Sequence, residues 1–506
     1  MASALDTTSF KPLAFAMFVV IIMITLAISV YFSRRVRTAG HYYVAGGGVK
    51  WFVNGIAFAG DYLSAASFLG IAGLIAFSGF DGFMYGIGFL AGWIVALFLI
   101  AEPLRVMGKY TFADALVHKF KSKRVRLAAA ISTLIVSVFY LIPQMVGAGT
   151  IVQPLLGFSY EWGVLIVGGI VILIVATAGM VSTTWVQFIK AILLLIAAIG
   201  LTIGVLFAVG MDPITFIGHF ISSGAANPAT GNPNAYSGDT FMSPGLKYHD
   251  PLDYASLALA LILGTAALPH ILIRYYTVPK PADARKSTVV AIIAMGVFYV
   301  LILFLGLGTN YFAGQGAFLV TDSNLAAPTL ANYIGGEVFF ALISSIAFAT
   351  ILGTVSGLIM AAAGAIAHDI YTEIMGKKSS EKAALRVSKI TAVAVGLVAI
   401  VLGIIMKGQN VAFLVGLAFA IAASANIPAL ICTLYWKRAT EKGIVMGIFV
   451  GLALSLVLIA ASPTVMGSGA FFSLNNPGII SIPVGFATTI GVSLLDKKKY
   501  PEPVPV

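Results

Sequence analysis

The sequence predicts an all-α protein that crosses a membrane many times. Of its 506 residues, 59% are hydrophobic and only 10% are charged, and the mean hydropathy is +1.00. Soluble domains carry about a quarter charged residues, so most of this chain must face lipid. The single cysteine, Cys432, excludes a disulfide framework.

The first apolar run, residues 13–32, contains no charged residue. The apolar core of a signal peptide is shorter, about 7–15 residues, and ends in a cleavage site of small residues. Here the run is followed instead by Arg34, Arg35 and Arg37. We therefore expect a membrane helix that is retained.

Stretches long enough to cross a hydrocarbon layer of roughly 30 Å recur along the whole chain. The thirteen predicted spans are residues 13–32, 50–78, 82–103, 127–154, 161–181, 185–210, 252–276, 287–313, 332–370, 387–407, 410–434, 442–461 and 477–495. The runs 50–78 and 332–370 are long enough to be divided in other ways.

The basic residues test this count. Loops on one predicted side of the membrane hold every lysine and arginine except four, namely Lys11, Lys190, Lys247 and Lys407. Lys190 lies just inside its span, where its stem could reach the head groups, and no Lys or Arg is expected near the middle of any span. The positive-inside rule then places the amino terminus outside and the carboxyl terminus inside.

The net charge of +11 is thereby explained by membrane topology. The expected partners of the basic loops are anionic membrane lipids, not nucleic acid, and no obligate protein partner is evident.

The second span contains Asp61 beside Gly60, with Ser64 and Ser67 following. If the span starts near Lys50, Asp61 lies about 15 Å deep at a rise of ~1.5 Å per residue. An acidic residue at that depth by default marks a functional site, and we predict a coupling role for it. The alternative is a structural carboxylate that binds local amides where the helix breaks.

The span 252–276 also carries breaking residues, Gly264 and Pro269. Two interrupted spans at corresponding positions of successive five-helix units indicate an inverted-repeat transporter; a proline kink is the alternative at the second position. Half-helix amino termini favour an anion, and unwound carbonyls offer oxygen atoms to a hard cation. A carboxylate and a cation could therefore bind together there without a buried arginine.

This pattern divides the chain into five parts. We predict an extra amino-terminal helix and loop (1–49), a first repeat (50–210), a polar external loop acting as a cap or lid (211–251), a second, inverted repeat (252–436), and two further helices with a short tail (437–506).

Several motifs resemble those of bacterial cation/acetate symporters (acetate permease) in the sodium:solute symporter family. They are residues 60–70, 110–114, 144–149, 347–352 and 415–424, with Thr183-Thr184-Trp185-Val186-Gln187, Leu268-Pro269-His270-Ile271-Leu272 and His368-Asp369-Ile370-Tyr371. The resemblance covers nearly all of the chain. It implies a leucine-transporter-like five-plus-five fold in the bacterial cytoplasmic (inner) membrane, and import of acetate or a similar small carboxylate by alternating access.

The resemblance also implies a sodium site. Its ligands would be the carbonyl groups of Gly60, Leu63 and Thr350, together with positions Gly353 and Thr354. Na⁺ is then the coupling ion, and no other cofactor is expected.

Three departures from the family pattern leave alternatives open. Glycine at 353 removes a hydroxyl that the family often has, so coupling to H⁺ stays possible. Thr184 stands where an aspartate is common, which weakens the case for a second sodium ion. Asp61 falls one residue before the acidic position of the proline-transporting relatives, so its direct role is open.

For the solute, the resemblance suggests hydroxyl groups of both breaks and one amide. These residues are Tyr62, Ser64, Ser67, Gln144 and Thr265. Ser and Thr hydroxyls also commonly bond their own helix backbone, which is the alternative for each of them. Propionate, pyruvate and glycolate differ from acetate by a few atoms, so the sequence does not rank these substrates.

Other classes of function have less support. An intramembrane enzyme could use Asp61 and His270 as acid and base, but the sequence positions no nucleophile. A channel would show conductance without coupling to a gradient. His270 and His368 lie on separate predicted spans without a spaced partner, so we expect no transition-metal site.

Overall fold

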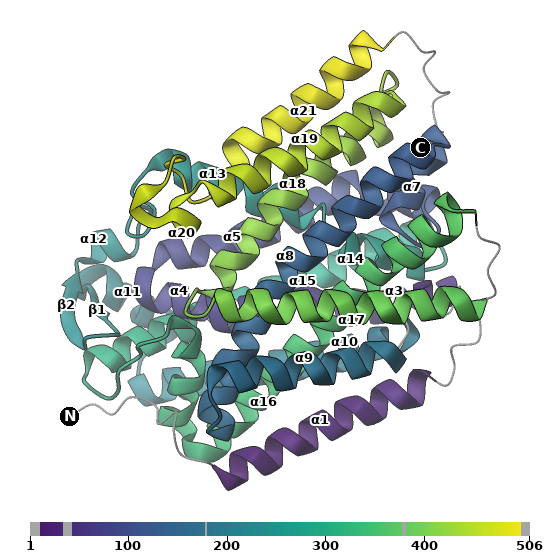
Figure 1. Ribbon diagram of the computed structural model, residues 1–506. Helices are drawn as coiled ribbons and strands as arrows, with labels where there is room; N and C mark the ends of the chain where they lie inside the picture. The colour runs from purple at the N-terminus through teal and green to yellow at the C-terminus, as the bar shows by residue number, and fades with distance from the viewer. Residues whose placement is uncertain (1–10, 34–42, 178–179, 377–380, 497–506) are drawn as a thin grey trace.

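The computed structural model describes residues 11–33, 43–177, 180–376 and 381–496 (Figure 1). The α-helices are α1 (Pro12–Ser33), α3 (Trp51–Tyr62), α4 (Ile71–Ser78), α5 (Phe80–Leu99), α6 (Ala101–Met107), α7 (Phe112–Phe120), α8 (Lys123–Leu156), α9 (Tyr160–Thr177), α10 (Met180–Val209), α11 (Pro213–Ser223), α12 (Gly238–Phe241), α13 (Pro251–Thr265), α14 (Pro269–Leu272), α15 (Pro281–Gly314), α16 (Ala326–Gly364), α17 (Glu381–Ile405), α18 (Val411–Tyr435), α19 (Glu441–Ala460), α20 (Pro463–Met466) and α21 (Gly478–Leu495). The π-helical segment η2 (Ala66–Gly70) leads into α4, and a second one, η5 (Ala365–Ile374), continues α16. The 3-10 segment η3 (Ile273–Thr277) follows α14.

Each predicted span coincides with a helix or a pair of helices. Among the described residues, eleven helices are long and apolar enough to cross a membrane, and the bent pair α3 and η2–α4 makes a twelfth span. The predicted span 161–181 corresponds to α9 (Tyr160–Thr177), an apolar helix of 18 residues. The orientation stays a prediction, and Arg34, Arg35, Arg37 and the lysines 497–499, on which it partly rests, lie outside the described residues.

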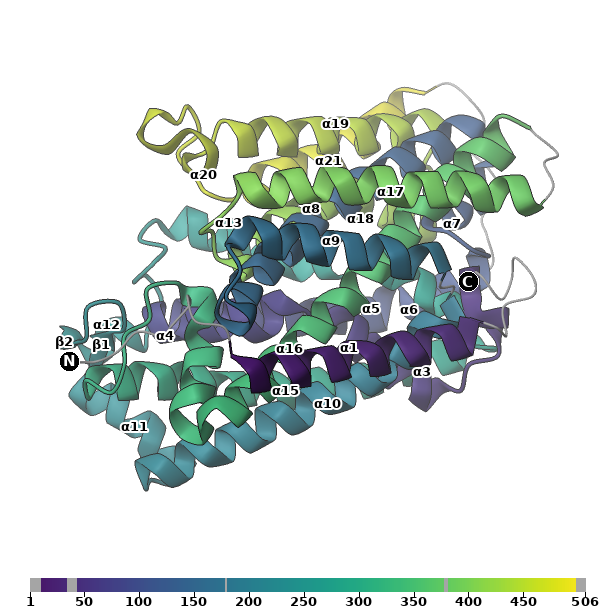
Figure 2. The same ribbon diagram turned by 60° about the horizontal axis from the view of Figure 1, so that its bottom comes forward.

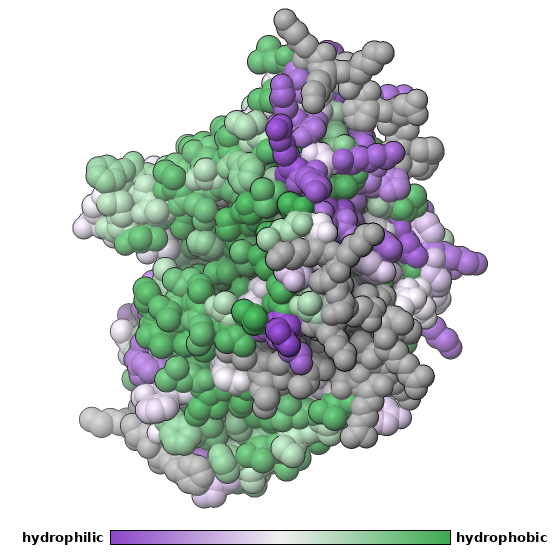
Figure 3. All heavy atoms as spheres, turned by 45° about the vertical axis from the view of Figure 1, so that its right-hand side comes forward, coloured by the Kyte–Doolittle hydropathy of each residue, from purple (hydrophilic) through white to green (hydrophobic). Residues whose placement is uncertain are grey.

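The outer surface of the helix bundle is apolar, as contact with lipid requires. Large apolar side chains such as Phe98, Ile203 and Phe207 are exposed, Phe207 by 89%. Figure 3 shows a broad apolar surface over the body of the molecule, with hydrophilic side chains gathered at one end. A surface of this kind is stable against hydrocarbon and not against water.

The helices around the two breaks form the centre of the bundle. α3 packs against α10 and α15, and α8 packs against α16 and α18. α1 lies on the outside along α16 and α10, whereas α19 and α21 cover α18 on the other side (Figures 1 and 2).

The predicted external loop contains α11, α12 and a two-stranded antiparallel sheet of β1 (Ala225–Asn227) and β2 (Asn232–Tyr236). The loop is fastened to the bundle, because the Asp81 carboxylate accepts backbone N–H groups of Lys247 (2.6 Å) and Tyr248 (3.1 Å). At Gly79 φ is +50°, and a Cβ would lie 1.9 Å from the Phe241 carbonyl oxygen, so only glycine fits beneath the loop.

Candidate functional site

The first break lies where the sequence predicts it. α3 ends at Tyr62, Leu63 and Ser64 are not helical, and the second half of the span is bent by 63° relative to the first. The Ser64 hydroxyl accepts the N–H of Ala66 (3.3 Å) and so caps the second half. Gly60 brings α3 against α10, since a Cβ there would lie 2.0 Å from the Gln187 carbonyl oxygen.

The second break follows α13. Between Thr265 and the start of α14 at Pro269 the chain leaves the α-helix, and the Asn426 side chain donates to the Ala267 carbonyl (3.0 Å). Gly264 allows close approach of α18, because a Cβ would lie 2.4 Å from the Phe419 carbonyl oxygen. The predicted interruption near Gly264 and Pro269 is therefore present in the structure.

Residues of the two breaks meet directly. The hydroxyl groups of Tyr62 and Thr265 are 2.7 Å apart and share a hydrogen bond. The Thr265 hydroxyl also donates to the carbonyl of Leu261 in its own helix (2.8 Å), so the local alternative holds there as well. Ser67 bonds the Tyr299 hydroxyl (3.3 Å) from α15.

Aromatic rings surround this contact. The Tyr62 ring lies 5.6 Å from Phe89, 5.5 Å from Trp93 and 6.1 Å from Phe419, measured between centroids. Tyr140 extends the wall, with its ring 5.5 Å from Phe419. These rings are fully or almost fully buried.

Trp93 of this wall and two further residues carry polar atoms without a partner among the described residues. Trp93 Nε1, both amide atoms of Gln144 and both ring nitrogens of His270 are buried without a hydrogen-bond partner among the described residues. The His270 ring lies 5.3 Å from that of Tyr140, and Gln144 follows Tyr140 by one helical turn. Buried polar groups in native proteins almost always have partners, so atoms of a ligand would explain these.

The sequence predicted Gln144 but not Trp93, Tyr140 or Phe419. A signal existed for Tyr140, which lies four residues before Gln144, and for His270, which directly follows the second break.

The predicted sodium ligands of α16 face the first break. Thr354 donates its hydroxyl to the Asp61 carbonyl (3.3 Å), which lies between the predicted ligands Gly60 and Leu63. Thr350 is one turn away on the same face, and its hydroxyl bonds the Ala347 carbonyl (2.5 Å). The structure thus brings α16 and the broken segment together.

Lys190 occupies an unexpected position. Its ammonium donates to the Thr350 carbonyl (3.0 Å) and to the Thr354 hydroxyl (3.0 Å), and the residue is only 4% exposed. The prediction that Lys190 extends to the head groups is wrong. Lys190 lies one turn from Gln187 on the inner face of α10, so its stem is directed at α16.

Asp61 is the centre of a buried ion pair. Its carboxylate accepts Nε of Arg274 (2.5 Å) and the Gln187 amide (2.9 Å), and both charged residues are 1% exposed. A Cβ at Gly357 would lie 2.7 Å from Asp61 Oδ1, so this glycine makes room for the carboxylate. The partners of the carboxylate are thus side chains of distant elements and not the local amides of the structural alternative, while a coupling role stays a prediction.

The expected absence of Arg or Lys from the span interiors is therefore wrong at Arg274 as well as at Lys190. The chain after α14 turns under α3, where Asn54 donates to the Arg274 carbonyl (3.4 Å) and Val49 N–H to that of Thr277 (3.0 Å). Arg274 is thus inside the bundle and not in a loop, and its charge offsets the cost of burying Asp61.

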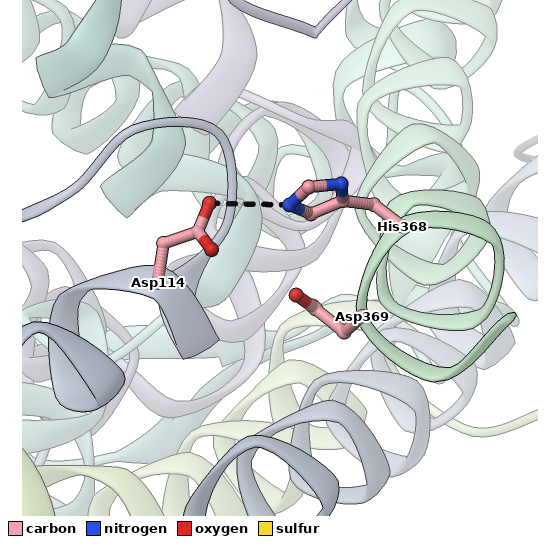
Figure 4. A group of neighbouring side chains, drawn as sticks. All are labelled: Asp114, His368 and Asp369. Carbon is pink, nitrogen blue, oxygen red and sulfur yellow. Dashed lines mark ion pairs between the residues drawn. The ribbon is translucent and has the colours of Figure 1, made fainter. Parts of the chain in front are cut away.

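A second charged cluster ties α7 to η5 (Figure 4). Oxygen and nitrogen atoms of Asp114, His368 and Asp369 lie within 4.8 Å of one another, and His368 points at Asp114 at 3.5 Å. Arg126 Nη1 contacts both carboxylates, at 2.7 Å and 2.8 Å. Burial raises the pKa of Asp114, but the hydrogen bond of His368 and the charge of Arg126 outweigh burial and hold this pKa well below its usual value.

The expectation that His368 has no partner group is wrong, because the fold brings Asp114 of α7 close to His368 and to its sequence neighbour Asp369. A metal ion nevertheless fits this cluster poorly, since the guanidinium already neutralises the carboxylates. The cluster instead holds α7, α8 and η5 together at the predicted cytoplasmic end.

Two interrupted spans that meet at a buried site, inside a bundle with a lipid-facing surface, define a secondary transporter. Residues 42–451 match the model of the sodium:solute symporter family. The chain is 47% identical over 484 residues to the "Uncharacterized symporter YwcA" of Bacillus subtilis (strain 168), covering 94% of this chain and 92% of that protein. The chain belongs to the sodium:solute symporter family, as a multi-pass symporter of the bacterial inner membrane and not an enzyme.

Solved structures confirm the leucine-transporter-like fold. A Na⁺-coupled sialic acid symporter in a substrate-bound outward-open state matches with a TM-score of 0.80 at 16% identity, covering 98% of this chain and 100% of that one. Mhp1, a nucleobase-cation-symport-1 family transporter in a closed conformation, matches with a TM-score of 0.55 at 13% identity, covering 91% of this chain and 97% of that one.

Proposed function

We propose that the protein imports a short-chain monocarboxylate of the size of acetate together with Na⁺, by alternating access around the two breaks. The observation that supports the substrate class is the buried aromatic wall, where polar atoms of Trp93, Gln144 and His270 have no hydrogen-bond partner among the described residues.

The chemistry of these groups suits a small anion. The Trp93 indole N–H and the Gln144 NH₂ group are donors, and a carboxylate only accepts hydrogen bonds. The amino terminus of the second half of the first span adds positive dipole charge. The ring wall favours a solute with a short apolar end, such as the methyl group of acetate.

The Na⁺ gradient would supply the driving force, with the ion bound at the first break. The Asp61 carbonyl and the Thr354 hydroxyl approach to 3.3 Å, which brings together two kinds of oxygen suited to a hard cation. One positive charge that falls through 100 mV releases about 2.3 kcal/mol. The Na⁺-coupled relative with the similar fold supports sodium. H⁺ is the second candidate, because Gly353 supplies no hydroxyl.

The test is uptake of labelled acetate into proteoliposomes with an inward Na⁺ gradient, an inward H⁺ gradient or neither. We expect the Na⁺ gradient to stimulate uptake. Stimulation by the H⁺ gradient alone would show that H⁺ and not Na⁺ is the coupling ion. No response to either gradient would refute coupling and favour a channel.

A competition panel of propionate, pyruvate, glycolate and a neutral amide of acetate should then rank the solutes. One methylene changes binding by only about 1–3 kcal/mol, so related acids should compete. Inhibition by the amide as strong as by acetate would contradict recognition of a carboxylate.

A further inference from the structure

Lys190 places a positive charge on the oxygen atoms that the family resemblance assigns to sodium. Its ammonium lies 3.0 Å from the Thr350 carbonyl oxygen and 3.0 Å from the Thr354 hydroxyl oxygen. An ammonium group has three donors and no acceptor, so it binds the same kind of oxygen atoms that coordinate a hard cation.

Gly353 fits this arrangement in two ways. It lacks the hydroxyl that would serve as a further sodium ligand, and it makes room for the lysine. A Cβ at this position would lie 3.1 Å from Lys190 Cδ and 2.8 Å from Gln187 Oε1. A serine at 353 would therefore press on the stem of Lys190, whereas glycine lets the stem cross α16.

We propose that Lys190 is a tethered cation of the sodium site, so that its ammonium and Na⁺ compete for Thr350 and Thr354. Two positive charges a few ångströms apart repel strongly in a buried site. In addition, neither oxygen atom can bind the ammonium and Na⁺ at the same time. Sodium then binds only when the ammonium withdraws. This inference rests on the proposed function, which supplies Na⁺ as the competing ion.

The structure offers a place for the displaced side chain. A cavity of about 210 Å³ adjoins Lys190 between α1 and α16; apart from Lys190 itself and Thr25 of α1, whose hydroxyl is the one polar group offered to the ammonium, its lining is apolar. The stem of lysine has four carbons and is flexible, so a rotation would carry the ammonium from α16 towards α1 without moving a helix.

The test is equilibrium binding of labelled Na⁺ to the purified full-length protein, with the sodium-induced shift of Tm as a second readout. The variants are Lys190→Met, which removes the charge, and Lys190→Arg, which retains it. Lys407→Met is the matched control, because Lys407 is an exposed lysine paired with Glu161 at 2.7 Å.

We expect Lys190→Met to lower the half-saturating Na⁺ concentration by roughly tenfold or more, since removal of the competing charge favours the ion. Lys190→Arg and Lys407→Met should show no such decrease. An unchanged or higher half-saturating concentration in Lys190→Met overturns the proposal.

A second pair of variants tests the role of Gly353 and serves if Lys190→Met folds poorly. Gly353→Ser alone should lower Tm and fail to strengthen Na⁺ binding, because the serine meets the lysine stem. In a Lys190→Ala background the serine still meets Gln187 Oε1, the end of a flexible side chain that can shift, but no longer meets the lysine stem, and Na⁺ binding should be stronger than in Gly353→Ser alone. Stronger binding by Gly353→Ser with Lys190 present overturns the placement of the stem.

Acetate uptake separates this inference from the proposed function. If Na⁺ drives uptake by the wild type but Lys190→Met leaves Na⁺ binding unchanged, the inference fails and the function stands. If the wild type neither binds nor responds to Na⁺ while Lys190→Met gains Na⁺ binding, the lysine holds the site permanently and sodium coupling fails. If Lys190→Met also binds no Na⁺, the inference fails.

Discussion

The two breaks differ in the charge that surrounds them. At the first break Asp61 lies against Arg274, and Lys190 of α10 donates to the Thr350 carbonyl of α16. At the second break the Ala267 carbonyl is bound by the neutral Asn426. A site that handles an ion needs compensated charge nearby, while a site that selects a small solute needs shape and neutral hydrogen bonds. This difference agrees with the proposal that the ion binds at the first break and the solute contacts both.

The largest effect is expected from breaking the ion pair at the first break. Arg274→Met should destabilise the protein by about 3–5 kcal/mol, because it leaves the buried Asp61 charge unpaired. The decrease in Tm of the purified protein measures it. The double variant Asp61→Asn with Arg274→Met should recover much of this loss, and a double variant no more stable than Arg274→Met would contradict the pairing.

A smaller effect is expected from a change on α16, the helix that carries the predicted sodium ligands Thr350 and Thr354. Thr354→Ala removes an oxygen atom from the predicted sodium site, and the half-saturating Na⁺ concentration for acetate uptake should rise by about tenfold, the equivalent of one hydrogen bond. Thr350→Val is the control, since the carbonyl of Thr350 and not its hydroxyl faces Lys190. An unchanged sodium requirement in Thr354→Ala would remove this residue from the site.

Loss of the hydrogen bond between the two breaks should have a smaller effect than loss of the ion pair or of the Thr354 hydroxyl. Tyr62→Phe or Thr265→Val deletes the 2.7 Å hydrogen bond, and each should raise the KM for acetate by a factor that corresponds to about 1 kcal/mol. Because one bond is shared, the double variant should resemble the single ones. Strictly additive effects would show that the hydroxyl groups act separately.

The smallest effect is expected from Thr184→Ala. The Thr184 hydroxyl donates to the Met180 carbonyl of its own helix (2.8 Å), so uptake should change roughly twofold or less. A large rise in the sodium requirement would instead place a second ion near α10 and remove the contrast between the two breaks.

The spans and both breaks could be predicted from the sequence for one physical reason. A backbone in lipid must satisfy its own hydrogen bonds, so long apolar runs indicate helical spans. Residues that disfavour a continuous helix, Gly60 with Ser64 and Gly264 with Pro269, indicate where a span is interrupted. The orientation and the limits of the repeats stay predictions.

The buried charges could not be predicted in the same way. Hydropathy places charged residues in loops, and therefore Arg274 and Lys190 were assigned to the membrane surface. Their partners are distant in sequence, with Asp61 213 positions from Arg274, and no local pattern links them. Trp93 and Phe419 were missed because an aromatic residue of the site and one that faces lipid look alike in a single sequence.

The pairing of Asp61 with Arg274 has a consequence for the response to voltage. A carboxylate and a guanidinium in contact carry no net charge, so the membrane potential exerts almost no net force on the pair, wherever it moves during the cycle. The electrical work of the cycle would then fall on the charge that Thr350 and Thr354 hold. A lysine there would make the return of the solute-free carrier sensitive to voltage.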